Sequence, residues 1–206
     1  NTCGLFETDI VKISELTHKS GGYLYCDGAN FNAVVGKLKP GDLGIDAMHI
    51  NLHKTFSTPH GGGGPGSGPV VFSNRLEKFC PTPLVKNIKG DFILVEDSNE
   101  KDLTKSFGRL NVFHGQMGMF VRAMSYMLSH GADGLKQVSE DAVLNANYLR
   151  ASLSSHLTPA FNGFCMHEIL FSDDFLKDTG VETLDFAKAM IDEGYHPMTI
   201  YFPLVI

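Results

Sequence analysis

The stretch HINLHKTFSTPHGGGGPGSGP, from His49 to Pro69, decides how this chain is interpreted. It joins three histidines and one lysine to a glycine-rich tail. The apolar run DAMHINLH leads into it and is typical of a buried strand, and GPVVFS predicts a further strand at its end. The sequence therefore predicts a glycine-rich turn between two strands, with Lys54 just past the first of them.

Two kinds of phosphate-binding loop are excluded. A P-loop needs its lysine directly after the glycines, whereas Lys54-Thr55 precedes them here. A dinucleotide-binding loop needs its glycines to open a helix, and Pro65 and Pro69 prevent a helix there.

A metal site is not favoured either. His49 and His53 would share one face of a strand, and His60 lies seven positions further on. No carboxylate or thiolate lies close enough in the sequence to complete the ligand set.

An acidic residue, Asp27, lies upstream of Lys54 in the sequence. Asp27 follows the short apolar strand Tyr23 to Cys26, and ligands of open α/β sheets bind at the carboxyl ends of strands. A partly desolvated lysine at such an edge can form a Schiff base with an aldehyde. A carboxylate facing the ring nitrogen is what pyridoxal phosphate needs to act as an electron sink, and Ala29 is small enough for a flat ring.

Composition bounds the class of protein. The 206 residues are 43% hydrophobic and 19% charged, as in a globular domain, and the net charge of −6 argues against binding to nucleic acid. No apolar run is long enough to span a membrane. The four cysteines are widely spaced, which favours reduced thiols over a disulfide framework.

The order of elements predicts an α/β fold. Strands alternate with helices over the first 75 residues, which favours a parallel or mixed sheet. Further helices are expected over 7–19, 115–129, 135–155 and 183–194, further strands over 164–172 and 198–205, and mostly loop over 75–106. The chain starts at Asn1 and ends in the apolar run MTIYFPLVI, so we expect it to be part of a larger polypeptide.

The long segment YLYCDGANFNAVVGKLKPGDLGIDAMHINLHKTFSTPHGGGGPGSGPV closely resembles the glycine dehydrogenase (decarboxylating) family. These are the P-proteins of the glycine cleavage system, fold-type-I pyridoxal-phosphate enzymes. NTCGLFE, SEDAVLNANYLRA, CMHE and HPMTIYFPL are similar to the C-terminal half of that family. The resemblance is weakest between Arg75 and Lys105.

The resemblance implies a fold. Residues 1–130 would form part of a cofactor-binding large domain with a mostly parallel sheet. Residues 131–206 would form a linking helix and part of a small C-terminal α+β domain. Both domains would be incomplete, since the usual phosphate-binding turn and ring-stacking residue lie upstream of the strand that carries Asp27.

The resemblance also implies site residues. Lys54 would carry pyridoxal phosphate as a Schiff base. The other expected cofactor contacts are Asp27 at the pyridine nitrogen, Ala29 against the ring, Asn30 at the phenolic oxygen, and Asn51 and His53 near the phosphate. The approach path for a substrate would be lined by His60, Gly61, Gly62, Gly63 and Gly64.

The implied activity is decarboxylation of glycine with transfer of the aminomethyl group to the lipoyl arm of H-protein. The implied partner is the N-terminal half of the P-protein, in the same polypeptide or as a separate subunit, without which we expect no activity. The location would be bacterial cytoplasm or mitochondrial matrix. Two alternatives stay open: another fold-type-I pyridoxal-phosphate enzyme, such as an amino-acid decarboxylase, and a non-catalytic interaction fragment.

Some side chains favour structural roles. Methionines 117, 119, 124 and 127 follow a helical pattern and are expected to fill a core. Arg109 and Arg122 are expected to form salt bridges. For His167 and His196, a structural role and a place in the substrate domain are equally expected.

Overall fold

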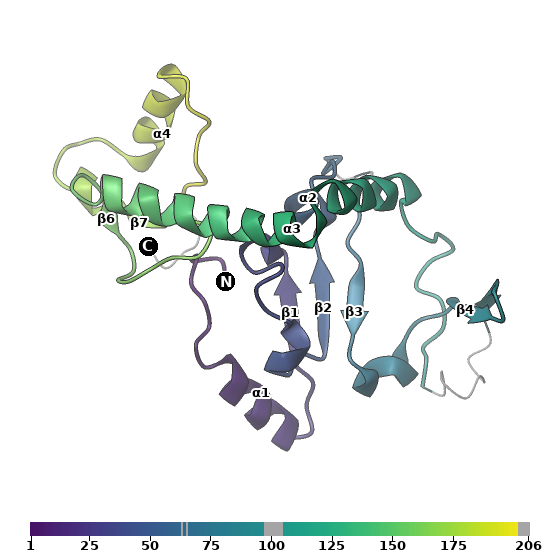
Figure 1. Cartoon of the computed structure of the whole chain (residues 1–206). Helices are drawn as coiled ribbons and strands as arrows, with labels where there is room; N and C mark the ends of the chain where they lie inside the picture. The colour runs from purple at the N-terminus through teal and green to yellow at the C-terminus, as the bar shows by residue number, and fades with distance from the viewer. Residues whose placement is uncertain (63, 65, 97–104, 202–206) are drawn as a thin grey trace. The chain divides into compact units, whose positions relative to one another are not determined.

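A three-stranded mixed sheet carries the segments that the sequence singled out (Figure 1). The computed structural model describes residues 1–62, 64, 66–96 and 105–201. Strands β1 (Tyr25–Gly28) and β2 (Ala47–Ile50) pair in parallel, and β3 (Val70–Phe72) pairs antiparallel to β2. All three strands were predicted, and the sheet is of the mixed kind.

The chain divides into two compact units. One is Thr8–Leu135, which contains the sheet, and the other joins Asn1–Glu7 to Lys136–Ile206. The domain boundary at residue 130 and the roles of the two domains stay predictions. No described helix is long and apolar enough to cross a membrane.

Helix α1 (Ile10–Lys19) confirms the first predicted helix, but its apolar stripe is not its buried face. Ile13 and Leu16 are 38% and 57% exposed, whereas Ser14 is buried. The Ser14 hydroxyl donates to the carbonyl of Gly44 at 3.1 Å. A Cβ on Gly44 would lie only 2.0 Å from that hydroxyl oxygen, so a small residue is required where this helix meets the chain before β2.

The expectation of mostly loop over 75–106 is wrong for its described part. After the 3₁₀ helix Asn74–Phe79, strands β4 (Leu84–Ile88) and β5 (Asp91–Val95) form an antiparallel hairpin. The two turn residues, Lys89 and Gly90, both have positive φ, which matches the twist of a tight hairpin. Residues 97–104 lie outside the described part of the chain.

Helix α3 (Met117–Leu153) contains the predicted break. Gly131 has non-helical backbone angles, φ 63° and ψ −174°, so two helical segments meet there. The expectation that the methionines fill a core is wrong for three of the four. Met119 is buried, but Met117, Met124 and Met127 are 68%, 52% and 37% exposed.

The second unit holds the C-terminal elements. Strands β6 (Thr158–Pro159) and β7 (Phe171–Ser172) pair antiparallel, so the strand predicted over 164–172 is wrong except for its last two residues. Helix α4 (Thr183–Asp192) was predicted, and Gly194 ends it with a positive φ. Residues 198–201 form no strand, and the rest of the strand predicted to 205 lies outside the described residues.

An asparagine and the N-terminal segment hold this second unit together. The Asn147 side chain accepts from the Cys165 amide at 3.1 Å and donates to its carbonyl at 2.7 Å. The Met166 amide donates to the Gly4 carbonyl at 2.7 Å. All four cysteines are free thiols, as predicted.

Asp46, directly before β2, has a side chain with several hydrogen-bond partners among the described residues. Only 2% of it is exposed. Its carboxylate accepts from the Leu24 amide at 3.0 Å, the Ser73 hydroxyl at 3.0 Å and Arg75 at 3.1 and 3.2 Å, and it lies 2.8 Å from Nε2 of His18. One carboxylate thus ties α1 and the chain entering β1 to the segment that leaves β3.

These contacts also set the charge state of Asp46. Desolvation acts to raise its pKa, but the hydrogen bonds from Leu24, His18 and Ser73 and the charge of Arg75 outweigh it. The pKa therefore lies below the ordinary value of 3.8. Because the folded pKa is lowered, the stabilisation is present above that ordinary value and is lost as the pH falls through the lowered one.

Replacing Asp46 should therefore destabilise the fold in a pH-dependent way. Asp46→Asn in the full-length protein should lower the free energy of unfolding by about 2–3 kcal/mol at neutral pH, because charge-assisted hydrogen bonds are lost. The loss should shrink in acid, where the wild-type carboxylate is protonated too. Urea unfolding across pH measures this, with Asp42→Asn, an exposed carboxylate nearby, as control. Equal midpoints for the two variants at neutral pH would contradict it.

Candidate active site

The carboxyl ends of β1 and β2 lie side by side and point toward α2 (Leu52–Thr55) (Figure 1). Asp27 on β1 pairs in register with His49 on β2. A Cβ on Gly28 would lie 2.0 Å from the His49 carbonyl oxygen, so the two strands approach this closely only because position 28 has no side chain. Asp27 and the residues after β2 are thereby brought to one edge of the sheet.

Helix α2 is a single turn whose buried side faces the core. Leu52 and Phe56, four positions apart, are 5% and 7% exposed. They pack in a cluster that also contains Val35 and Ala123. Lys54 lies midway between them in sequence and is exposed, so the helix turns the lysine away from the core.

Four of the predicted site residues are connected here. The Lys54 ammonium donates to the Asn30 side-chain oxygen at 3.5 Å. The Ala29 amide donates to Oδ1 of Asp27 at 2.9 Å, which fixes the turn after β1. The Asp27 side chain is 71% exposed and is therefore accessible to a ligand.

His53 does not share a strand face with His49, because His53 lies on α2 and His49 on β2. The backbone turns at Asn51, whose carbonyl accepts from the amides of Lys54 and Thr55. The His53 ring packs edge-on against the His60 ring, with centroids 4.6 Å apart. Among the described residues, no group of three or more potential ligands could hold a metal ion.

Polar atoms near Lys54 are buried without a hydrogen bond. Nδ1 of His53 and the hydroxyls of Thr55 and Thr58 have no partner among the described residues. Such groups cost free energy unless something satisfies them. All three lie within six residues, His53 to Thr58, around Lys54.

The glycine-rich tail is a tight turn followed by an extension of the sheet. Gly61, Gly62 and Gly64 have positive φ, and the Gly64 amide donates to the Gly61 carbonyl at 3.0 Å. Gly63 and Pro65 lie outside the described residues. The returning chain then continues the ladder beside β2, since the Ile50 amide donates to Pro69 and the Leu52 amide to Ser67. The turn therefore starts and ends next to Lys54.

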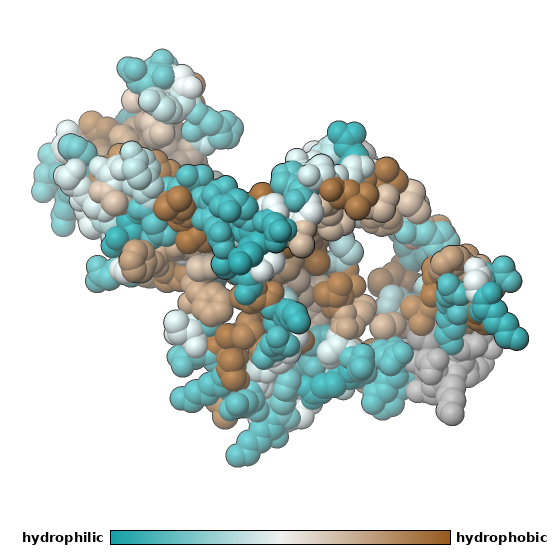
Figure 2. Space-filling view, viewed as in Figure 1, coloured by the Kyte–Doolittle hydropathy of each residue, from teal (hydrophilic) through white to brown (hydrophobic). Residues whose placement is uncertain are grey.

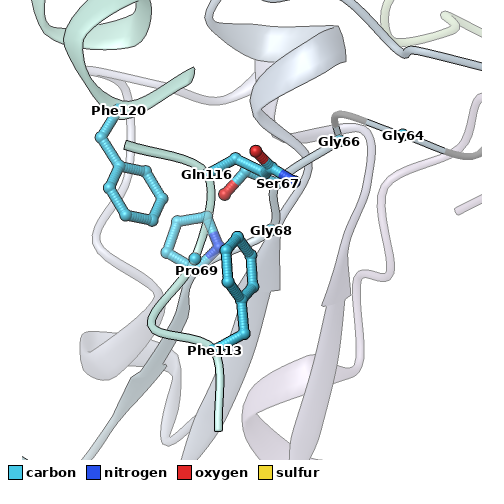
Figure 3. A pocket seen from close by; sticks show the side chains of 9 residues that line it. Gly64, Gly66, Ser67, Gly68, Pro69, Phe113, Gln116 and Phe120 are labelled. Carbon is cyan, nitrogen blue, oxygen red and sulfur yellow. The ribbon is translucent and has the colours of Figure 1, made fainter. Parts of the chain in front are cut away.

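A cavity of about 400 Å³ adjoins this tail (Figure 3). The rings of Phe113 and Phe120 flank Pro69, and Ser67 and Gln116 supply polar groups. Neither Lys54 nor Asp27 lines it. It is a mixed apolar and polar hollow next to the lysine segment, not the lysine site itself.

Several connected residues were not foreseen. His49 contacts both Tyr25 and Asp27, and the side chains of Thr55 and Thr58 carry the buried hydroxyls without partners among the described residues. Tyr25 and Asp27 are two apart on one strand and so share a face, which a strand assignment alone could have shown. Arg109 forms an ion pair with Glu96, as predicted.

Comparisons with known proteins point to one family. A family model described as glycine dehydrogenase, C-terminal domain, matches residues 138–206. The chain is 67% identical over 207 residues to a probable glycine dehydrogenase (decarboxylating) subunit 2 from Caulobacter vibrioides, and 51% identical over 207 residues to one from Thermotoga maritima. The chain belongs to the glycine dehydrogenase family. It spans 40% and 42% of those two relatives, and 100% of it is covered in both alignments.

Solved structures confirm the α/β fold. An inhibitor-bound glycine decarboxylase (P-protein) of the glycine cleavage system matches with a TM-score of 0.68 and 22% identity, over 93% of this chain and 44% of that one. A Lactobacillus brevis glutamate decarboxylase matches with a TM-score of 0.58 and 14% identity, over 91% and 42%. At these identities the likeness shows the fold alone.

The environment of His53 predicts its titration. Desolvation first, then the nearby His60 and Lys54, lower the pKa of His53 below the ordinary value of 6.5. His53 should therefore be neutral at neutral pH. As the pH falls below 6.5, the His53 ring should take up a proton in the unfolded state before it does so in the folded state, and the free energy of unfolding should therefore fall in acid. NMR titration of the ring should give a midpoint below 6.5 that rises in His60→Gln. A midpoint at or above that value would contradict the buried, cation-flanked environment.

Proposed function

We propose that Lys54 binds pyridoxal phosphate and that the full-length protein decarboxylates glycine and passes the aminomethyl group to the lipoyl arm of H-protein. The observation that carries the proposal is the placement of Lys54 and Asp27 at the carboxyl edge of two adjacent parallel strands, linked through the turn that holds Asn30. Family membership supports the reaction, because the relatives are named glycine dehydrogenase (decarboxylating).

The residues at this edge fit the cofactor. An aldehyde needs an exposed amine, and Lys54 offers one that is turned away from the core. A pyridine nitrogen needs an exposed carboxylate, and Asp27 offers one. A phosphate needs hydrogen-bond donors. The hydroxyls of Thr55 and Thr58, and Nδ1 of His53 in the tautomer that carries its hydrogen there, are buried donors without partners in the described chain.

Each residue then has a defined task. Pyridoxal phosphate supplies an electron sink for the carbanion left by decarboxylation. Lys54 would hold the cofactor covalently. The Lys54 ammonium donates to the Asn30 side chain, and Asn30 would contact the phenolic oxygen. Asp27 keeps a proton on the pyridine nitrogen, and Ala29 leaves room for the ring. Asn51 and His53, one on each side of Leu52 in the sequence, would contact the phosphate.

The glycine-rich tail suits a long, thin substrate arm. Gly62 and Gly64 have open space where a side chain would be, so these two positions present bare backbone. The adjoining cavity is apolar at Phe113 and Phe120 and polar at Gln116, as an aliphatic arm with a polar link requires. We assign His60 and Gly61 to Gly64 to this approach path.

Apolar surface supports a partner for this chain. Side chains on the hairpin and beyond it are exposed, among them Phe92 at 74%, Leu110 at 76% and Val112 at 84%. Figure 2 shows hydrophobic side chains at the surface of the face in view. Surfaces of this kind mark contacts with other protein. We propose that the N-terminal half of the P-protein covers them, in the same polypeptide or as the separate subunit that the relatives' name, subunit 2, implies. Residues 1–130 would then belong to the cofactor-binding domain and 131–206 to the small domain.

The assignment of Lys54 has a direct chemical test. When the full-length protein and its partner half are loaded with pyridoxal phosphate and reduced with borohydride, the label should map to the peptide that contains Lys54. Lys54→Arg should abolish the label while the protein still folds. A label on another lysine would overturn the assignment.

The role of Asp27 predicts separate effects on binding and turnover. Asp27→Asn should lower the rate of glycine decarboxylation roughly 10²-fold or more, because the ring nitrogen loses its stabilised charge. Labelling of Lys54 should survive, since the amine and the phosphate contacts remain. The assay is release of CO₂ from carboxyl-labelled glycine with H-protein, and Asp42→Asn serves as a surface control. Near-normal turnover in Asp27→Asn would show that the carboxylate does not support the ring.

A further inference from the structure

Three side chains form a connected chain on one face of the sheet. The Tyr25 hydroxyl lies 2.5 Å from Nδ1 of His49, and Nε2 of His49 lies 3.1 Å from Oδ1 of Asp27. The Tyr25 and His49 rings are stacked, with centroids 5.8 Å apart and planes at 20°. Tyr25 and Asp27 project from the same face of β1, and His49 is the register partner of Asp27 on β2.

The donors and acceptors in this chain can be arranged in only one way if Asp27 is ionised and the His49 ring is neutral. The carboxylate accepts only, so Nε2 of His49 must carry a hydrogen and donate it. Nδ1 of the neutral ring is then an acceptor, and the Tyr25 hydroxyl donates to it. The hydrogen bond from Tyr25 thus favours the His49 tautomer in which Nε2 carries the hydrogen and donates to Asp27.

This chain fixes one oxygen of Asp27 and leaves the other available. Oδ1 accepts from the Ala29 amide at 2.9 Å and from His49. Among the described residues, no hydrogen bond reaches Oδ2. Because the side chain is 71% exposed, rotation about its bonds would be free without those two donors. The carboxylate is therefore held in one orientation with an oxygen open to a ligand N–H.

The exposure of these groups argues against a purely structural purpose. Tyr25 is 57% exposed, so water would satisfy its hydroxyl if the bond to His49 were absent. A hydrogen bond in such a place contributes little to stability. Its main physical consequence is the orientation of His49 and, through it, of Asp27.

We propose that Tyr25 and His49 are positioning residues that hold the Asp27 carboxylate against a protonated ring nitrogen. This inference rests on the proposed function, in which Asp27 faces the pyridine nitrogen of pyridoxal phosphate. Tyr25 and His49 do not touch the reacting atoms, and they act only through Asp27. Outer groups that orient metal-ligating side chains typically change affinity or activity about 10–100-fold when they are removed, and we expect an effect of similar size here.

The test measures the protonation of the ring nitrogen directly. The full-length protein with its partner half is loaded with pyridoxal phosphate labelled with ¹⁵N in the ring, and the ¹⁵N shift is read by NMR. Tyr25→Phe removes only the hydroxyl, His49→Phe keeps a stacked ring without a donor, and His49→Gln restores a donor and an acceptor. Tyr23→Phe is the control, because Tyr23 makes only ring contacts in the described chain.

We expect the ¹⁵N shift to move toward the unprotonated form in Tyr25→Phe and further in His49→Phe. It should return most of the way in His49→Gln and stay unchanged in Tyr23→Phe. The turnover rate should fall roughly 10-fold and 10²-fold in the first two variants. In an Asp27→Asn background, Tyr25→Phe should have no further effect on either quantity, because residues that act through one another are not additive.

The outcomes separate this inference from the function on which it rests. If Lys54 takes no label on borohydride reduction, the proposed function fails and the positioning role fails with it. If Lys54 is labelled but the ¹⁵N shift stays at its wild-type value in His49→Phe, the positioning role alone is overturned. A fall in thermal stability with an unchanged ¹⁵N shift would likewise show that the chain is structural.

Discussion

The buried carboxylate of Asp46 is the constraint on which the arrangement of the sheet depends. It sits directly before β2 and accepts donors from the chain entering β1 and from the chain leaving β3. The backbone of Asp46 bonds to the same two segments, since its amide donates to the Leu24 carbonyl and its carbonyl accepts from the Ser73 amide. A buried charge of this kind is tolerated only when its lone pairs are satisfied, so the surrounding segments have little freedom to shift.

That constraint at one end of the sheet fixes the geometry at the other end. Because β1 and β2 are in parallel register from Tyr25 opposite Ala47, Asp27 comes opposite His49 at the carboxyl edge. The bare backbone of Gly28 allows the close approach there. The apolar anchors Leu52 and Phe56 then hold the single turn of α2. Lys54 and Asp27 are placed by backbone pairing and core packing, not by any bond to each other.

The site combines rigid support with unsatisfied polar groups. The strands and the core under α2 are well packed, whereas His53, Thr55 and Thr58 keep buried polar atoms without partners in the described chain. Buried polar atoms without partners are retained where a bound ligand can supply the missing hydrogen bonds. The exposed apolar side chains are a comparable feature at a larger scale, and we propose that another stretch of protein covers them.

The sequence by itself determined the elements with strong local patterns and the residue types of the site. The helices α1 and α4, the three strands of the sheet and the break at Gly131 follow from periodicity and from glycines. The hairpin after β3 was missed because a lysine in the left-handed region, Lys89, is an uncommon turn residue that propensity does not single out.

Only the tertiary structure decided what depends on distant partners. The hydrogen-bond partners of the Asp46 side chain lie 22 to 29 positions away along the chain, so no local pattern could reveal that this aspartate is buried. The connection of Tyr25 and His49 to Asp27 likewise needs the register of two strands. Spacing could place Asp27 and Lys54 at one edge, because strand direction alone does so, but side-chain contacts across strands are set by register and packing.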